Sequence, residues 1–154
     1  MFDVVLYQPE IPPNTGNIMR LCANTGTVLH LIHPLGFDLE DTKLRRAGLD
    51  YREWADVREH ASIEAFVEGV DPARVIAFTR DGENRYSDVD YQPGDALLFG
   101  PESNGLPDEV LGHSLVDRRV RIPMLPRSRS LNLSNAVAVV LFEAWKRHDF
   151  AGGV

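Results

Sequence analysis

The chain has 154 residues, which suits one domain, and its 44% hydrophobic and 25% charged residues are typical of globular proteins and exclude a disordered chain. Sixteen Lys and Arg against 23 Asp and Glu leave a net charge of −7, which excludes a surface that is cationic throughout, so nucleic acid would have to bind to a local patch. The single cysteine, Cys22, excludes an internal disulfide and a CxxC motif.

Five short segments rich in Val, Ile and Leu are predicted as strands. They are residues 2–6, 28–32, 75–78, 96–99 and 120–122. Because these segments are apolar on both faces, they suit the buried strands of a parallel sheet. The first segment lacks the basic start of a signal peptide, and no apolar run approaches the ~20 residues of a membrane span. We therefore expect a cytoplasmic protein.

Helices are predicted between and after these strands. From Ile18 to Thr25, apolar residues recur at the spacing of one helix face, with Asn14 as the expected N-cap after two prolines and Gly26 as the stop. Further helices are expected at residues 40–47, 62–68 and 132–147. This alternation predicts an α/β fold, a mostly parallel sheet flanked by helices, in a single domain over residues 1–154.

Several familiar sites are absent from the sequence. Residues 100–105 (GPESNG) have P-loop glycine spacing, but Leu106 and Pro107 replace the Lys and Ser/Thr that bind phosphate and magnesium. No GxGxxG motif follows the first strand, so the usual dinucleotide fingerprint is missing. His30 and His33 lie an odd number of residues apart on a predicted strand, which would point them to opposite faces. No metal is expected.

Three segments carry polar residues that a plain core would not require. Residues 14–20 (NTGNIMR) place Arg20 and amides on a helix, where a solvated face is the simpler explanation. Residues 97–107 end a strand in a glycine and proline turn, where parallel sheets bind ligands, although the turn alone would explain them. Residues 122–135 are rich in Ser and Asn, and capping of the last helix accounts for only one or two of these.

Basic residues are concentrated near the third segment. The stretch from 118 to 129 holds no acidic residue and contains Arg118, Arg119, Arg121, Arg127 and Arg129. A run of arginines is usually solvated surface, but its position beside the Ser and Asn segment predicts a patch that binds phosphates. A second basic group consists of Lys43, Arg45 and Arg46.

In order, the stretches NTGNIMRLCANTG, LLFGPESNGLP and IPMLPRSRSLNLSNAVAVVLFEAW resemble the three signature motifs of the SPOUT superfamily of RNA methyltransferases, in its ribose 2′-O-methylating branch. The opening VVLYQPEIPPNTGNIMRLCANTG and the short length are most similar to the TrmL group, the tRNA (cytidine/uridine-2′-O)-methyltransferases. The resemblance covers residues 2–147. It implies a C-terminal deep trefoil knot in the α/β domain and a homodimer. Because the C-terminal helix is apolar almost all round, we expect this helix and the helix of Asn14 to pack against the partner.

The resemblance also implies a cofactor and site residues. S-Adenosylmethionine is the implied methyl donor, bound chiefly by backbone groups of the knot loops. The implied cofactor-binding positions are Phe78, Gly100, Ile122 and Ser130. The implied catalytic positions are Arg20, which is essential for methyl transfer, and Asn14, Glu102 and Asn132, which shape the site.

The substrate implied by the resemblance is the tRNA anticodon stem-loop, with methylation of the wobble nucleotide, cytidine or uridine at position 34, in leucine tRNAs. Alternatives are another tRNA position, ribosomal RNA, or a non-catalytic relative that only binds RNA. The presence of Arg20, Glu102, Ser130 and Asn132 argues against the non-catalytic alternative. A flavodoxin-like ligand-binding domain would explain the sheet but not the third segment.

Overall fold

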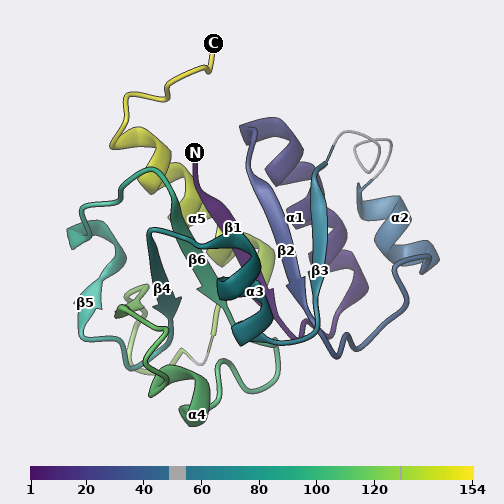
Figure 1. The fold of residues 1–154 in the computed structure, drawn as a ribbon, viewed down its shortest axis with the longest axis horizontal. Coiled ribbons are helices and arrows are strands. Elements are labelled where there is room, and N and C mark those ends of the chain that lie inside the picture. The colour runs from purple at the N-terminus through teal and green to yellow at the C-terminus, as the bar shows by residue number, and fades with distance from the viewer. Residues whose placement is uncertain (49–54, 129) are drawn as a thin grey trace.

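A parallel sheet of seven strands forms the middle of the molecule, in a computed structural model that describes residues 1–48, 55–128 and 130–154 (Figure 1). The strands are β1 (Asp3–Tyr7), β2 (Val28–Ile32), β3 (Val57–His60), β4 (Arg74–Phe78), β5 (Asn84–Arg85), β6 (Asp95–Phe99) and β7 (Arg118–Arg121). Their order is β3-β2-β1-β6-β4-β7-β5, and every neighbouring pair is parallel. The predicted parallel α/β fold is therefore confirmed.

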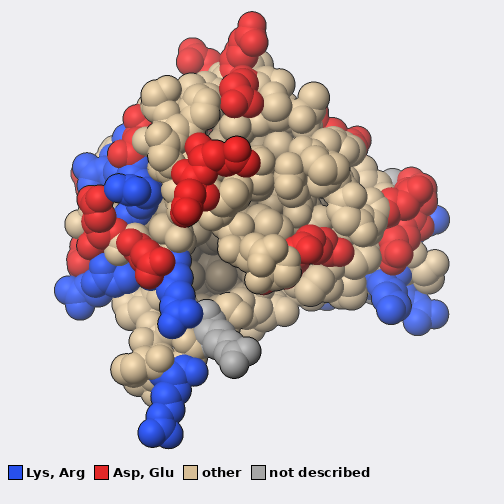
Figure 2. Space-filling view, turned by 90° about the horizontal axis from the view of Figure 1, so that it is seen from below, with Lys and Arg blue, Asp and Glu red and all other residues tan. Residues whose placement is uncertain are grey.

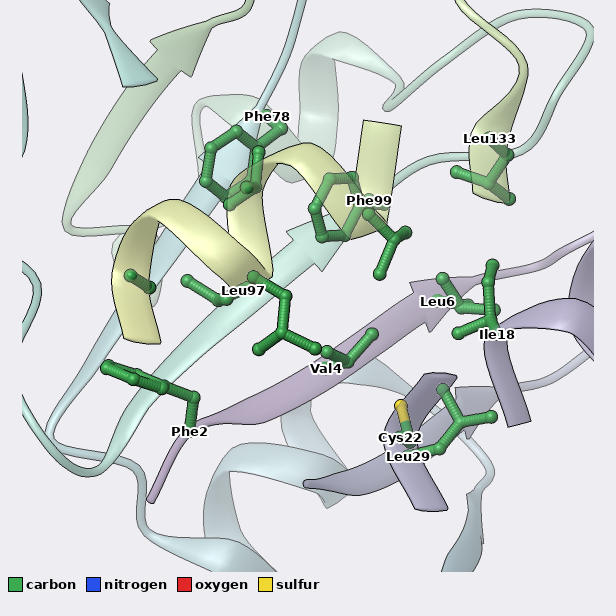
Figure 3. Packing of buried hydrophobic residues seen from close by; sticks show 14 of the residues in the cluster. Phe2, Val4, Leu6, Ile18, Cys22, Leu29, Phe78, Leu97, Phe99 and Leu133 are labelled. Atoms are coloured by element: carbon green, nitrogen blue, oxygen red, sulfur yellow. The ribbon is translucent and has the colours of Figure 1, made fainter. Parts of the chain in front are cut away.

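The helices cover both faces of the sheet. They are α1 (Pro12–Thr25), α2 (Thr42–Gly48), α3 (Ile63–Val70), α4 (Asp108–Leu111) and α5 (Leu133–Lys146), with a 3-10 turn, η2 (Tyr86–Asp88). Side chains alternate along β1, so that Val4 packs with residues of α1, α2 and α5, whereas Val5 packs with residues of α3 and α4. Figure 3 shows Val4 and Leu97 in the first of these cores, together with Ile18 of α1.

Two strands, β3 and β5, and the short helix α4 were not predicted. In β3, Arg58 and Glu59 are exposed, because this strand lies at the edge of the sheet. In β5 there are only two residues, which pair with β7 alone. Edge strands carry too little apolar sequence to stand out from loops.

The start of α1 differs from the prediction, and its end agrees. The N-cap is Ile11, with two prolines in the first turn, so Asn14 is not the N-cap but lies inside the helix. Prolines suit this place because the first helical N–H groups have no partner within the helix. Gly26 ends the helix in the left-handed conformation, with φ of 67°, as predicted.

The two histidines of the second predicted strand have different positions. His30 lies in β2, is buried, and is hydrogen-bonded to Asp3 and His60. His33 follows the end of β2 and contacts Glu59, so the prediction of opposite strand faces does not apply to it. Among the described residues, no group of three or more His, Cys, Asp or Glu is placed to hold a metal ion. None of the helices in these residues is long and apolar enough to cross a membrane.

Candidate active site

A cavity of about 710 Å³ opens at the carboxyl ends of β4, β6 and β7. Because these strands are neighbours in the sheet, the loops that follow them meet at one edge, where parallel sheets bind ligands. Figure 2 views this edge, toward which the arrows in Figure 1 point, and shows a hollow in it. Most of the lining comes from residues 78–81 and 99–106, and from Ile122, Met124, Ser130, Leu131, Leu133 and Ala136.

Two aromatic rings form the apolar part of this lining. Phe78 and Phe99 are register partners at the ends of β4 and β6, and their rings stack with centroids 4.7 Å apart and planes 9° apart. Figure 3 shows the two rings side by side. All four residues expected at the cofactor site line this one cavity, namely Phe78, Gly100, Ile122 and Ser130.

Main-chain segments pass very close to one another around the cavity. A Cβ atom at Gly100 would lie 2.2 Å from the nitrogen of Leu106, and one at Gly82 would lie 2.2 Å from the carbonyl carbon of Val120. Only glycine fits at either place, since real Cβ atoms do not approach backbone atoms so closely. The loop after β6 therefore folds back on itself and exposes main chain, rather than side chain, at Gly100.

Glu102 joins this loop to the start of α1. Its Oε2 accepts hydrogen bonds from the backbone N–H groups of Glu10, at 2.7 Å, and Ile11, at 3.2 Å. Ile11 is the N-cap of α1, so Glu102 ties the main chain that leads into this helix to a distant loop. The other oxygen, Oε1, is buried and has no hydrogen-bond partner within the described residues.

Asn14 and Asn132 are brought together, as expected for residues of one site. Asn132 is the N-cap of α5 and accepts hydrogen bonds from the backbone of Ser134 and Asn135. Its Nδ2 donates to Oδ1 of the buried Asn14 at 3.0 Å. The first turns of α1 and α5 are thus joined beside the cavity, to which Leu133 also belongs.

Arg20 is not among the residues that line the cavity. It lies on α1 six positions after Asn14, about 9 Å further along the helix axis, and its side chain is exposed.

On the buried side of the same helix, burial raises the pKa of the Cys22 thiol to about 12, which keeps the thiol protonated and unreactive.

The predicted arginine patch separates into paired and exposed members. Arg119 forms an ion pair with Glu83 at 3.0 Å, and Arg121 donates to the carbonyls of Gly82 and Glu83. Arg118 and Arg127 are exposed, while Arg129 lies outside the described residues. Figure 2 shows Lys and Arg side chains on either side of the hollow. The second basic group, Lys43, Arg45 and Arg46, lies on the exposed side of α2, and Arg45 pairs with Glu40.

Ser103 lines the cavity and Glu10 supports it from outside, and neither was predicted as a site residue. Oε1 of Glu10 accepts hydrogen bonds from the backbone N–H and the hydroxyl of Ser103, at 2.9 and 2.7 Å. These bonds lower the pKa of the Glu10 carboxyl below its usual value. The two residues are 93 positions apart, and no motif in the sequence connects them.

The chain is similar to known RNA methyltransferases over its full length. It is 58% identical to the tRNA (cytidine(34)-2′-O)-methyltransferase of Methylovorus glucosotrophus, and the match covers 100% of both proteins. A protein solved to explain the 2-OH methylation of C/U34 on tRNA has a TM-score of 0.91 and 49% identity, covering 97% of each chain.

A third relative is more distant and was solved with a cofactor. The SpoU methyltransferase AviRb from Streptomyces viridochromogenes, in complex with AdoMet, has a TM-score of 0.84 and 26% identity, and the match covers 97% of this chain and 61% of that one. Residues 1–142 match the SpoU rRNA Methylase family. With this match and relatives of such high identity, the chain belongs to the SpoU rRNA Methylase family.

Proposed function

We propose that this chain transfers a methyl group from S-adenosylmethionine to the ribose 2′-hydroxyl of the wobble nucleotide, cytidine or uridine 34, in the tRNA anticodon loop. A relative that is 58% identical over 154 residues is a tRNA (cytidine(34)-2′-O)-methyltransferase. In this chain, the observation that carries the proposal is the single cavity whose lining unites the four residues expected to bind the cofactor.

The cavity fits S-adenosylmethionine, which supplies an activated methyl group when bound. Its volume of about 710 Å³ falls among typical small-molecule sites. Phe78 and Phe99 offer an apolar wall, and the exposed main chain at Gly100 offers backbone donors and acceptors. Recognition by backbone groups also accounts for the missing GxGxxG motif.

Methyl transfer is an in-line displacement in which a C–O bond forms as the S–C bond of the donor breaks. The hydroxyl loses its proton, so the site must align O2′ and stabilise its developing negative charge. We assign the second task to Arg20, which remains charged and lies on the exposed side of α1, where bound RNA can reach it. Water or an RNA phosphate then takes the proton.

Glu102, Asn14 and Asn132 shape the site in this proposal. Oε1 of Glu102 is buried without a partner among the described residues, which costs about 1–3 kcal/mol until a donor arrives. A hydroxyl or amino group of a bound ligand is such a donor. The Asn14–Asn132 hydrogen bond holds the start of α1 against the start of α5.

The proposed substrates are leucine tRNAs, recognised through the anticodon stem-loop. Loop nucleotides are unstacked, so their riboses are more accessible than those of an A-form helix. The exposed Arg118 and Arg127 and the basic residues of α2 supply cations for the phosphates. A tRNA substrate also places the enzyme in the cytoplasm.

A homodimer is part of the proposal. In α5, Val137 and Val140 are buried in the chain's own core, so this side of the helix is covered without a partner. Its outer side still exposes Val139, by 40%, and Phe142, by 45%. We expect Phe142→Asp to give a monomer by light scattering, while an unchanged dimer mass would contradict a dimer through α5.

The deep trefoil knot also remains a proposal. It is supported by the close passage of Gly82 against Val120, which shows that the loop after β4 is packed tightly against the chain entering the C-terminal segment. A crystal structure whose trace passes residues 122–132 through a closed loop would establish it. An unthreaded trace would contradict it.

The test of the proposed function is methylation of purified tRNA with labelled cofactor, followed by nuclease mapping and mass spectrometry of nucleosides. We expect one 2′-O-methyl group at nucleotide 34 of leucine tRNAs. A methyl group on a base, on ribosomal RNA alone, or outside the anticodon loop would overturn the substrate assignment. Absence of S-adenosylmethionine binding in calorimetry at near-millimolar ligand would overturn the enzyme assignment.

A further inference from the structure

Two carboxylates cross between the loop after β1 and the loop after β6. Glu102 accepts from the backbone N–H groups of Glu10 and Ile11, and Glu10 accepts from the backbone N–H and the hydroxyl of Ser103. Each glutamate thus binds main chain at or beside the other. We call this arrangement of Glu10, Ile11, Glu102 and Ser103 the carboxylate clasp.

The clasp joins the cavity to α1. Glu102 and Ser103 line the cavity, whereas Glu10 does not. On the other side, Glu10 and Ile11 lead directly into α1, which carries Asn14 and Arg20. Four hydrogen bonds of 2.7 to 3.2 Å therefore link the loop after β6 to the residues that lead into α1.

The backbone of Glu10 is held firmly on its far side. The N–H of Gly36 donates to the carbonyl of Pro9 at 2.9 Å, and the N–H of Gln8 donates to the carbonyl of Ile32 at 3.0 Å. A Cβ atom at Gly36 would lie 2.9 Å from Cα of Glu10, so the two segments are in direct contact. The Glu10 side chain therefore reaches Ser103 from a fixed support.

We propose that Glu10 is a positioning residue for methyl transfer, which couples the cofactor loop at Ser103 to the start of α1 through the carboxylate clasp. This inference rests on the proposed function. Glu10 touches neither cavity nor reacting atoms and acts through Ser103. With the clasp closed, cofactor bound against residues 100–106 orders the N–H groups of Glu10 and Ile11, and with them the helix that carries Arg20.

The chemistry at Glu10 requires an acceptor for two donors. One carboxylate oxygen takes both the N–H and the O–H of Ser103. A glutamine retains a carbonyl oxygen of the same reach, whereas alanine removes the acceptor. Glu10→Gln is therefore the conservative variant, and Glu10→Ala is the disruptive one. Glu68→Ala, an exposed glutamate of α3 outside the cavity lining, is the matched control.

Kinetics provide the first test. We expect Glu10→Ala to lower kcat for tRNA methylation by roughly ten- to a hundred-fold, with little change in the KM for tRNA or the Kd for S-adenosylmethionine, because misplaced groups cost rate more than binding. Glu10→Gln and Glu68→Ala should retain the wild-type kcat. Ser103→Ala, which keeps the backbone donor, should give a smaller loss than Glu10→Ala.

Amide hydrogen exchange provides the second test and needs no RNA. In the wild type, S-adenosylmethionine should slow exchange in residues 8–21 as well as in residues 100–106. In Glu10→Ala, we expect the slowing in residues 100–106 to remain and that in residues 8–21 to be lost. Gain of the same protection at residues 8–21 in Glu10→Ala would overturn the inference.

Two further outcomes would also overturn it. One is wild-type kcat in Glu10→Ala, and the other is a loss of kcat in Glu10→Gln as large as in Glu10→Ala, which would show that the hydrogen-bond acceptor is not what matters. Methylation of nucleotide 34 by the wild type reports on the proposed function, whereas the exchange difference uses cofactor alone and reports on the clasp. The two can therefore fail separately.

Discussion

Asn132 donates a hydrogen bond from Nδ2 to Oδ1 of Asn14 at 3.0 Å, across 118 positions of the chain. The same Asn132 side chain caps α5 through its Oδ1, which accepts from the backbone N–H of Ser134. One amide group therefore ends the loop that lines the cavity, starts α5 and fixes the first turn of α1. The two asparagines act as a joint between the cofactor side and the RNA side of the proposed site.

Substitutions of Asn132 separate its two roles. Serine is a good N-cap but too short to reach Asn14, whereas alanine can do neither. We expect Asn132→Ala to be less stable than Asn132→Ser by about 1 kcal/mol in urea unfolding, because only alanine loses the cap. Both variants should lose methyl transfer.

A control for stability alone is Ser62→Ala. Ser62 is the N-cap of α3, where its hydroxyl accepts from the N–H of Ala65 at 3.0 Å, and it does not line the cavity. Its loss should lower stability by about 1 kcal/mol as well, with methyl transfer unchanged. Wild-type methylation by Asn132→Ser would show that the hydrogen bond to Asn14 is dispensable.

The central strands were predictable because they are buried. Val5 of β1 and Leu98 of β6 are apolar neighbours in the middle of the sheet, and such segments stand out in any sequence. The edge strand β3 was missed because Arg58 and Glu59 face solvent. Burial, rather than pairing, is what the pattern of apolar residues reports.

The site was predictable only through the resemblance to a family. Ser130 and Phe78 both line the cavity, yet nothing in their spacing indicates that their loops meet. The contact of Glu10 with Ser103 depends on β1 and β6 being neighbours, an order that periodicity does not determine. A knotted path of the chain is still harder to predict from the sequence, because topology rules favour unknotted paths.

Gly100 provides a test of the cofactor site. A Cβ atom there would lie 2.2 Å from the nitrogen of Leu106, so Gly100→Ala must displace the loop that lines the cavity. We expect calorimetry to show at least about a ten-fold loss of S-adenosylmethionine affinity, equal to about 1.4 kcal/mol. Gly69→Ala is the matched control, because a Cβ atom in that helix meets nothing within 4 Å. Equal affinity of both variants would place the cofactor elsewhere.

Arg20 is expected to act on rate rather than on cofactor binding. Loss of a charged transition-state contact typically costs ~10²–10³ in rate, so Arg20→Ala should lose methyl transfer to at least this extent. Because Arg20 does not line the cavity, the Kd of the Arg20→Ala variant for S-adenosylmethionine should stay near the wild-type value. Arg20→Lys should fail too, since an ammonium group cannot replace a planar guanidinium. Normal turnover in both variants would move the catalytic role to another residue.

His60 should make stability depend on pH. Burial lowers the pKa of His60 below its ordinary value near 6.5, and the neighbouring His30 and Arg58 lower this pKa further. Nε2 of His60 faces Nδ1 of His30, whose other ring nitrogen lies 3.0 Å from Asp3. The unfolded chain therefore binds more protons than the folded one between the two pKa values, and stability rises with pH there. This contribution is present above about pH 6.5 and is lost as the pH falls through the folded pKa.

The measurement is the thermal midpoint from pH 7.5 down to 5.5. We expect the midpoint to fall over this interval in the wild type and to fall less in His60→Gln, which keeps a polar partner for His30 without titrating. His113→Gln is the control, because His113 follows α4 and pairs with Glu64 rather than with the His30–His60 pair. Parallel curves for the wild type and His60→Gln would contradict the role of His60.

Arg127 and Arg119 distinguish cations that are available to RNA from cations that are already paired. Arg127 is exposed and has no ion pair within the described residues, whereas Arg119 is paired with Glu83 at 3.0 Å. A phosphate contact contributes to affinity without entering the methyl-transfer step. We therefore expect Arg127→Ala to raise the KM for tRNA with little change in kcat, and Arg119→Ala to change either constant less.

Salt dependence sharpens this comparison. Binding of RNA by the wild type should weaken steeply as salt increases, because phosphate contacts release counterions. Removal of one phosphate contact in Arg127→Ala should reduce the slope of log Kd against log salt by about 1. In Arg119→Ala the slope should stay near that of the wild type, because Glu83 already neutralises this guanidinium. An unchanged slope in Arg127→Ala would place the RNA backbone on another surface. The basic residues of α2 would then be the next to substitute.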